Sequence, residues 1–303
     1  MRIIIVGLGV QGEKRHKIAG DQCVATVEIR DGLGDFKSVR DVPLNTFDAA
    51  ILCLPDNQKY ETIDYLLRND KHVMVEKPLM FDELDELKNL YDNAMKKGLV
   101  LYTAYNHRFE PAFVEMKNLI ESDQLGKIYY IRMFYGNGTA RLVKDSKWCD
   151  SGLGVLSDLG SHLLDTLNYW FPKLNIEFEV IVKNKFENRV PDHVNILSSN
   201  VLPQINLEMT LCMWRNHFTC DVLAEKGSAH IESLCKWGPS SFIKRSRILP
   251  SGRPREEKTT LVREDPTWKL EYEEFKRLVN SGLTMNATRD VWIQSTLAKL
   301  SEQ

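Results

Sequence analysis

The sequence predicts an α/β fold in two parts: an N-terminal doubly wound parallel sheet, and a C-terminal α/β domain with a mainly antiparallel open sheet. Two patterns predict this. In the first part, short apolar runs alternate with helical stretches, as in a parallel sheet covered by helices on both faces. After about residue 125, several runs alternate apolar and polar residues, as antiparallel strands with one solvated face do. We therefore expect domains 1–120 and 121–303.

The N-terminal part is expected to contain five strands separated by helices. Residues 2–6 form an apolar run that stops at a glycine, which is typical of a strand buried on both faces. Asp82 suits the N-cap of the last helix of this part, and Gly98 suits its end. The predicted strands are 2–6, 23–29, 49–54, 72–75 and 99–102, and the predicted helices are 10–19, 58–67 and 81–97.

The C-terminal part is expected to be mainly strands with one helix embedded before most of them, at 157–171. Two further helices, at 267–280 and 289–300, close the chain. The segment 238–258 is rich in Pro, Gly, Ser and Arg, which predicts a long surface loop or an irregular hairpin. The predicted strands are 127–135, 177–183, 193–199, 204–213, 217–224 and 228–233.

Composition and charge limit the class of protein. The 303 residues are 43% hydrophobic and 27% charged, the profile of a globular protein with a sizeable core. A formal net charge of −2 gives no reason to expect nucleic acid or an anionic membrane as a partner. The basic run Lys14-Arg15-His16-Lys17 is short, and we expect it to be a solvated helix face.

Cysteine usage and hydropathy suggest the compartment. The six cysteines include no C-x-x-C pair, so we expect no metal site, and the pattern suits a reducing compartment. No apolar run approaches the roughly 20 residues needed to cross a membrane. The chain opens directly into a strand with no signal peptide before it, so we expect a cytoplasmic location.

A glycine motif follows the first predicted strand. Gly7, Gly9 and Gly12 stand between that strand and the first helix, as in a dinucleotide-binding Rossmann domain. The backbone there, including Val10 and Gln11, would approach a pyrophosphate, and free N–H groups at the helix start would favour the anion. An ordinary glycine-rich turn is the alternative interpretation.

An acidic residue about 20 positions after the motif should hold the ribose hydroxyls. Asp31 lies 19 positions after Gly12 and Glu28 lies 16 after it, and either suits this role. Arg30 lies between them and could instead bind a 2′-phosphate. We expect NAD as the cofactor, with NADP as the alternative.

Four segments together resemble the glucose-fructose oxidoreductase and inositol dehydrogenase (Gfo/Idh/MocA) family. The resemblance covers most of the chain, and four motifs in the right order are far more specific than one. The segments are GLGVQG at 7–12, KHVMVEKP at 71–78, YNHRFEP at 105–111 and GVLSDLGSHLLD at 154–165.

The resemblance implies roles for individual residues. Lys77 would lie beside the nicotinamide and donate to the substrate oxygen, with Pro78, often preceded by a cis bond in this family, fixing its position. His162 would be the general base. Asp158, four positions before it, would orient the imidazole or bind a substrate hydroxyl, and Asp165 would accept from a sugar hydroxyl. Taken alone, Glu76-Lys77 is equally typical of a surface ion pair, and His162 of a structural histidine.

Further residues are assigned to cofactor or substrate with their alternatives open. Asn106 and Arg108 either contact the ligands or join the two domains, and Trp148 is either a pocket wall or a core residue. The predicted cofactor-binding residues are Gly7, Gly9, Val10, Gln11, Gly12, Glu28, Arg30, Asp31, Leu54, Pro55, Asn57, Glu76, Lys77, Pro78 and Asn106. The predicted substrate-binding residues are Lys77, Arg108, Trp148, Asp158, His162 and Asp165.

Two departures from the family stand out. Only about 17 residues, from Asp31 to Asp48, fill a space where relatives carry a full helix and another strand, so we expect a more open adenine pocket. The usual Pro-Asn-x-x-His segment is replaced by Pro55-Asp56-Asn57-Gln58-Lys59, so a lysine stands in place of the histidine.

The sequence thus predicts an NAD(P)-dependent dehydrogenase acting on a secondary alcohol of a sugar, cyclitol or nucleotide-activated sugar. A reductase of a non-sugar carbonyl or imine on the same fold is one alternative. A dinucleotide-sensing regulator without turnover is another, kept open by the shortened adenosine side. The resemblance also implies a homodimer or homotetramer.

Overall fold

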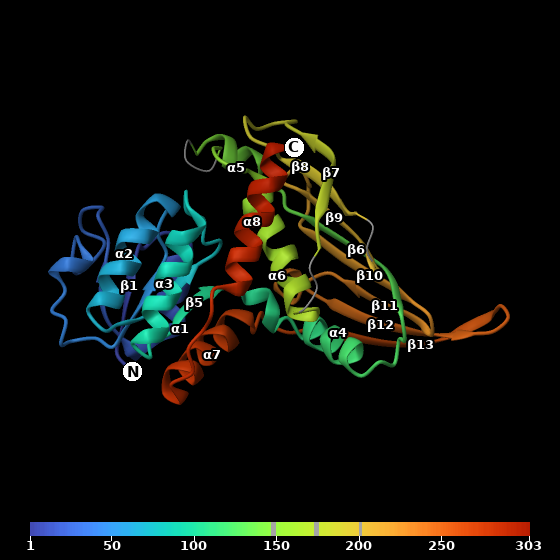
Figure 1. The fold of residues 1–303 in the computed structure, drawn as a ribbon, viewed down its shortest axis with the longest axis horizontal. Coiled ribbons are helices and arrows are strands. Elements are labelled where there is room, and N and C mark those ends of the chain that lie inside the picture. The colour runs from blue at the N-terminus through green and yellow to red at the C-terminus, as the bar shows by residue number, and fades with distance from the viewer. Residues whose placement is uncertain (147–149, 173–175, 200–201) are drawn as a thin grey trace. The chain divides into compact units, whose positions relative to one another are not determined.

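The computed structural model describes residues 1–146, 150–172, 176–199 and 202–303 (Figure 1). The chain forms two compact units. Unit 1 comprises Met1–Asn106 and Thr267–Ser295, and unit 2 comprises His107–Pro266 and Thr296–Gln303. These units divide the chain differently from the predicted boundary near residue 120. The chain returns to unit 1 because α7 (Thr267–Ser281) packs apolar side chains, including Phe275, into the core of that unit.

Unit 1 is built on a five-stranded parallel sheet of order β2-β1-β3-β4-β5. The central strand β1 is buried throughout, and its residues alternate between two apolar clusters. Ile4 and Val6 pack with residues of α2 and α3, whereas Ile3 and Ile5 pack with residues of α7. This two-sided burial is the physical reason for the continuous apolar run. The elements are β1 (Ile3–Val6), α1 (Val10–Ala19), η1 (Gly20–Gln22), β2 (Cys23–Val27), η2 (Val39–Asp41), β3 (Ala49–Leu52), α2 (Asp56–Arg68), β4 (His72–Glu76), α3 (Leu84–Lys96) and β5 (Leu101–Ala104).

Two details of unit 1 differ from the prediction. The N-cap of α3 is Glu83 rather than Asp82, because Glu83 and Glu86 form a capping box in which each side chain bonds the other's backbone N–H. Strand β2 ends at Val27 rather than Ile29. Between β2 and β3 the chain forms turns and the short η2, and Phe36 makes a single parallel bridge to Val27.

Unit 2 is built on an eight-stranded sheet of order β13-β12-β11-β10-β6-β9-β8-β7. Every neighbouring pair is antiparallel except β6 and β9, which run parallel. Figure 1 shows α4 and α6 along one face of this sheet. The elements are η3 (Asn106–Phe109, which begins at the end of unit 1), α4 (Pro111–Glu121), β6 (Ile128–Gly136), α5 (Ala140–Lys144), η4 (Leu156–Gly160), α6 (Ser161–Trp170), β7 (Phe178–Asn184), β8 (His193–Ser198), β9 (Gln204–Thr210), β10 (His217–Ala224), β11 (Gly227–Glu232), η5 (Cys235–Trp237), β12 (Ser240–Ile248) and β13 (Gly252–Leu261).

For segment 238–258 the sequence predicts either a long surface loop or an irregular hairpin. The segment belongs to a hairpin of β12 and β13, with a register shift between Ser246 and Ile248. The irregular-hairpin interpretation is therefore correct and the long loop is wrong. Strand β13 is exposed along almost its whole length, so neither of its faces needs apolar side chains. Its sequence therefore lacks the alternation of apolar and polar residues that predicts a strand.

The helix predicted at 157–171 is two elements. Its first part, η4, is a π-helical segment, and α6 continues it as an α-helix from Ser161. Single π turns inside helices occur frequently at functional sites.

The final helix, α8 (Thr288–Glu302), belongs to unit 1 as far as Ser295. In the described part of the chain, no helix is both long and apolar enough to span a membrane.

Candidate active site

The glycine turn of unit 1 has the backbone geometry of an anion cradle. Gly7 has φ of +90°, and a Cβ there would lie 2.5 Å from the Cys53 carbonyl oxygen. A Cβ at Gly12 would lie 1.8 Å from the Gly7 carbonyl oxygen, so any side chain would push α1 off the turn. Gly9 is the N-cap of α1, has open space around it, and leaves the first turn without a side-chain cap. These features fit a pyrophosphate held by backbone N–H groups.

Glu28 is the acidic residue that reaches this turn. Its carboxylate accepts from the Leu8 backbone N–H at 2.8 Å and from the Arg30 guanidinium at 3.1 Å. The Arg30 hydrogen bond is the main cause that lowers the pKa of Glu28 to about 2, against the opposing effect of burial. Asp31, the other candidate, is exposed and pairs with Lys37 at 2.7 Å. The structure therefore brings Glu28, and not Asp31, to the glycine turn.

The remaining cofactor candidates lie at strand ends and helix starts of unit 1. Val10 is 72% exposed at the start of α1, and Gln11 follows it as an exposed residue. Leu54 and Pro55 follow β3, with Pro55 as N-cap of α2 and Asn57 in the first turn of that helix. Their cofactor contacts stay predictions.

The segment Glu76-Lys77-Pro78, here called the Lys77 segment, leaves the carboxyl end of β4 with a cis bond before Pro78, as the resemblance implied. The Arg15 guanidinium bonds the Glu76 carboxylate at 2.7–2.8 Å. Lys59 donates to the Pro78 carbonyl oxygen at 2.8 Å. Lys77 is thus held between two buried cations, each bonded to one of its neighbours.

Arg15 is the exception to the predicted solvated helix face at 14–17, since Lys14, His16 and Lys17 are exposed as predicted and Arg15 is buried. Its side chain is 2% exposed and also pairs at 2.7 Å with Glu271, whose side chain is 0% exposed. The guanidinium lies 4.3 Å from the ring centroid of Trp268. These partners are 61 and more positions away, so no local pattern signals the burial.

Lys59 occupies the place of the family histidine. It is 2% exposed and pairs with Asp56 at 2.6 Å in addition to its bond to Pro78. Burial lowers the pKa of the Lys59 ammonium, against the attraction of the Asp56 carboxylate. The substitution noted in the sequence therefore gives the α2 helix a charged bond to the Lys77 segment.

In unit 2, His162 is the second residue of α6. It is 7% exposed, and its ring stacks on that of His107 with centroids 3.9 Å apart and an interplanar angle of 18°. Asp158 lies on the preceding π-helical segment and is exposed. Tyr135 on β6 and Lys236 on η5 complete the surroundings, since Lys236 Nζ lies 3.1 Å from the Tyr135 hydroxyl and 3.4 Å from His107 Nε2. His107 lies within the 105–111 motif but receives no role from the sequence, and Lys236 lies in none of the four motifs.

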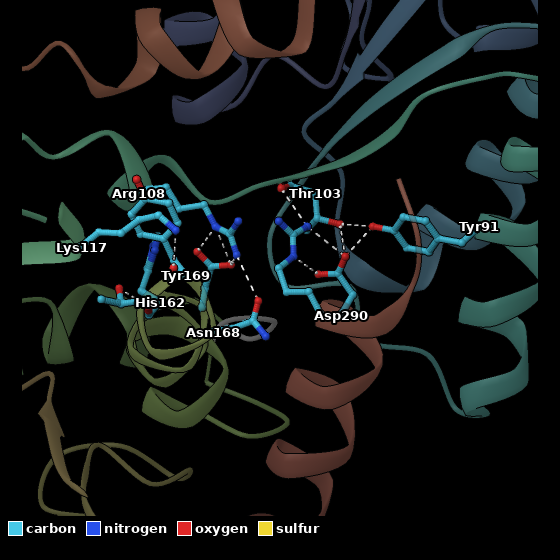
Figure 2. Close-up of polar contacts among 11 residues, drawn as sticks. Tyr91, Thr103, Arg108, Lys117, His162, Asn168, Tyr169 and Asp290 are labelled. Carbon is cyan, nitrogen blue, oxygen red and sulfur yellow. Dashed lines mark hydrogen bonds and ion pairs between the residues drawn. The ribbon is translucent and has the colours of Figure 1, made fainter. Parts of the chain in front are cut away.

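Arg108 and Asp165 form a bidentate ion pair. Arg108 Nε and Nη2 each donate to the Asp165 carboxylate at 2.8 Å, and Asp165 is 1% exposed. Figure 2 shows the Arg108 guanidinium also directed toward Asn168, which it reaches at 3.5 Å. The pair ties η3 to α6 and so supports the helix that carries His162. A substrate contact by either residue stays a prediction.

Asn106 and Trp148 complete the predicted set. Asn106 is buried and donates to the Thr267 hydroxyl at 2.7 Å, which joins the end of β5 to the start of α7 within unit 1. Because this bond lies within unit 1, it tests neither alternative, and both the cofactor contact and the joining of the two domains stay predictions for Asn106. Trp148 lies outside the described residues.

A second buried polar network, within unit 1, lies at β5. The Tyr91 hydroxyl bonds both Asp290 and Thr103, and Thr103 donates to Asp290 at 3.1 Å (Figure 2). Burial, reinforced by the Asp290 charge, raises the pKa of Tyr91. The network joins α3, β5 and the start of α8, and we assign it a structural role.

Comparison with known proteins agrees with these features. The family model for the Gfo/Idh/MocA "oxidoreductase family, NAD-binding Rossmann fold" matches residues 5–105, and the model for the Gfo/Idh/MocA C-terminal domain matches residues 113–230. An uncharacterised oxidoreductase of Schizosaccharomyces pombe is 34% identical over 124 residues, which are 40% of this chain and 33% of that protein. The myo-inositol 2-dehydrogenase of Thermotoga maritima is 26% identical over 149 residues, 44% of each chain.

The matched stretches thus span less than half the length of these two relatives. Among solved structures, a levoglucosan dehydrogenase in complex with NADH superposes with a TM-score of 0.83 at 16% identity, covering 100% of this chain and 96% of the other. At that identity the similarity shows the fold alone. The two family models together cover well over half of the chain and name the Rossmann fold found in unit 1. The chain therefore belongs to the Gfo/Idh/MocA family of oxidoreductases and carries its NAD-binding Rossmann fold.

Proposed function

We propose that this protein is an NAD(P)-dependent dehydrogenase that transfers hydride between nicotinamide and a secondary alcohol of a sugar, cyclitol or nucleotide-activated sugar. The observation that carries the proposal is how Lys77 is held. Arg15 bonds Glu76 on one side of it, and Lys59 bonds the Pro78 carbonyl on the other. Nucleotides bind at the carboxyl ends of parallel strands. A lysine anchored at the end of β4 therefore fits a group that acts on a reacting oxygen.

The proposed residues divide the tasks of alcohol oxidation. Lys77 donates a hydrogen bond to the substrate oxygen and stabilises the negative charge that develops there. His162 takes the hydroxyl proton on an imidazole nitrogen, since imidazole titrates nearest to neutrality. Asp158 orients the imidazole or accepts from a substrate hydroxyl. A bound nicotinamide supplies the hydride acceptor.

The position of Glu28 favours NAD over NADP. A carboxylate at the end of β2 suits a ribose 2′-hydroxyl and repels a 2′-phosphate. We expect Glu28→Gln to weaken NAD⁺ binding about tenfold or more, since hydrogen bonds to charged groups contribute about 1.5–3 kcal/mol. The change is measured as the NAD⁺ dissociation constant by calorimetric titration. Asp31→Asn, the matched change at the exposed acid, should leave it within about twofold. An equal loss of NAD⁺ affinity in both variants would contradict the assignment of Glu28 as the ribose-binding acid.

A thermal-shift titration with NAD⁺, NADH, NADP⁺ and NADPH tests the proposal first. We expect a saturable rise in Tm with NAD⁺ or NADH, because a ligand that binds the native state stabilises it. An absorbance screen at the nicotinamide band should then find turnover with cyclitols, sugars or nucleotide sugars, and Lys77→Met should abolish turnover while keeping the Tm shift. No shift with any dinucleotide would overturn the proposal. A shift without turnover would favour the dinucleotide-sensing alternative, and turnover only with non-sugar carbonyls or imines would favour the reductase.

The remaining proposals concern partners and location. A small sugar-like molecule is the proposed partner, and neither nucleic acid nor a membrane is proposed. We propose a homodimer or homotetramer, as the family resemblance implies, and a cytoplasmic location. Sedimentation of the purified protein distinguishes the two assembly states from a monomer.

A further inference from the structure

Lys236 lies at the centre of a cluster that the proposed mechanism does not use. The short η5 segment after β11 places its Nζ 3.1 Å from the Tyr135 hydroxyl and 3.4 Å from His107 Nε2. The ammonium also lies 4.7 Å from the ring centroid of Trp237. Because an ammonium has only N–H donors, His107 Nε2 must be the acceptor. A protonated Lys236 therefore favours the neutral His107 tautomer that carries its proton on Nδ1.

His107 connects this ammonium to His162. The two imidazoles stack with centroids 3.9 Å apart, and Tyr135 lies beside both rings at 5.5 and 6.2 Å. Two stacked imidazolium rings would repel each other, so a positive charge on one ring disfavours protonation of the other. The Lys236 ammonium beside the stack likewise disfavours a positive charge on either ring. The charge state of His162 therefore depends on Lys236 as well as on His107.

We propose that Lys236 is a positioning residue, which holds His107 as a neutral acceptor and keeps the neighbouring His162 unprotonated and ready to act as the base. The inference rests on the proposed function, because it assigns a role to the same histidine. It goes beyond that function by naming a residue on another element that sets the proton affinity of the base. The contacts involved all lie within unit 2.

Charges on several neighbouring elements act on Lys236. Burial lowers the pKa of Lys236, and the carboxylates of Glu110, Asp265 and Asp158 oppose this and favour the ammonium. Burial also raises the pKa of Glu110 and of the Cys235 thiol, so both are biased toward their neutral forms. A negative charge near an imidazole favours its protonation, whereas a positive charge such as that of Lys236 opposes it. Among the described residues, Tyr135 on β6 lies against both rings of the stack. The charges that act on Lys236 come from Glu110 before α4, Asp265 before α7, Asp158 on η4 and Cys235 on η5. Arg108, next to His107 in the chain, is paired with Asp165.

Titration of the histidine ring protons by NMR tests the inference without requiring turnover. His107→Gln and His162→Gln assign the two resonances in the full chain. In Lys236→Met the titration midpoint of the stacked pair should move upward by about one to two pH units, because removing a nearby positive charge stabilises imidazolium. Lys236→Arg, which keeps the charge, should stay within about half a unit of the parent. Lys244→Met removes a partly exposed lysine of the same unit that bonds Gln124, and should leave the midpoint unchanged.

Turnover gives a second, separate readout. With a substrate in hand, the acid limb of kcat/KM for alcohol oxidation should move upward in Lys236→Met by the same amount, with rates above the limb retained. Lys236→Gln repeats the test with a polar side chain should the methionine variant fail to fold. A midpoint unmoved in both charge-removing variants would overturn the inference, whatever the activity. Turnover absent in the parent protein would instead count against the proposed function and leave the NMR test intact.

Discussion

Replacing Arg15 with methionine is expected to lower the free energy of unfolding by about 3–5 kcal/mol. The guanidinium bridges Glu76 and Glu271, and the Glu271 side chain is fully buried. Despite the opposing effect of burial, these carboxylates raise the pKa of Arg15 above its ordinary value, so the bridge is charged. Without Arg15, the buried Glu271 carboxylate loses its counter-ion in a medium that solvates it poorly. Equilibrium unfolding in urea, followed by tryptophan fluorescence and circular dichroism, measures the loss.

Two controls separate the buried bridge from general effects of charge. Lys14→Met removes a neighbouring cation that lies 5.1 Å from the Trp268 ring centroid but forms no buried bridge, and should change stability by less than about 1 kcal/mol. Adding Glu271→Gln to Arg15→Met should recover part of the loss, because the orphaned charge is then removed. A loss below about 1 kcal/mol for Arg15→Met alone would mean that the bridge contributes little to unit 1.

The sequence was sufficient for the fold wherever burial imposes a pattern. The strands β1 and β3 are buried on both faces and read as continuous apolar runs, and β10 alternates as a strand with one solvated face does. Strand β13 is exposed, so its residues carry no such pattern. The sequence therefore leaves a surface loop and a hairpin as alternatives for this segment. The helix α7 was predicted as a helix, but periodicity does not say which core it packs against.

The residues of the candidate site likewise fall into those that the sequence identifies and those that it does not. Residues within motifs, such as Lys77 and His162, could be named from the sequence because chemistry fixes their type and local spacing. Arg15, Lys59 and Lys236 could not be given roles, because their roles come from contacts with segments 19 to 256 positions away. Arg15 is the clearest example. Its basic neighbours in sequence suggest a solvated helix face, whereas its side chain is buried by residues far away in the chain. The choice between Glu28 and Asp31 likewise needed the structure, because only Glu28 bonds the Leu8 N–H.

Replacing His162 with glutamine is expected to reduce kcat for alcohol oxidation by about 10²–10⁴-fold, the range that general base catalysis contributes. Glutamine keeps polarity and approximate size but cannot take a proton at neutral pH. The NAD⁺ dissociation constant should stay within about twofold, because the glycine turn and Glu28 belong to unit 1. Steady-state rates with saturating cofactor and substrate measure the loss. His217→Gln, at an exposed position of β10, is the matched control and should retain activity.

The pH dependence of the same variant distinguishes a base from a structural histidine. Above the pKa of His162 the parent enzyme should reach a plateau, because the imidazole is already neutral. In His162→Gln the residual rate should keep rising with pH, about tenfold per unit, because hydroxide or an alkoxide formed in solution must replace the missing base. A merely structural histidine would give a variant whose profile keeps the parent's shape at a lower level. That outcome, or a kcat within about tenfold of the parent, would show that another group removes the hydroxyl proton.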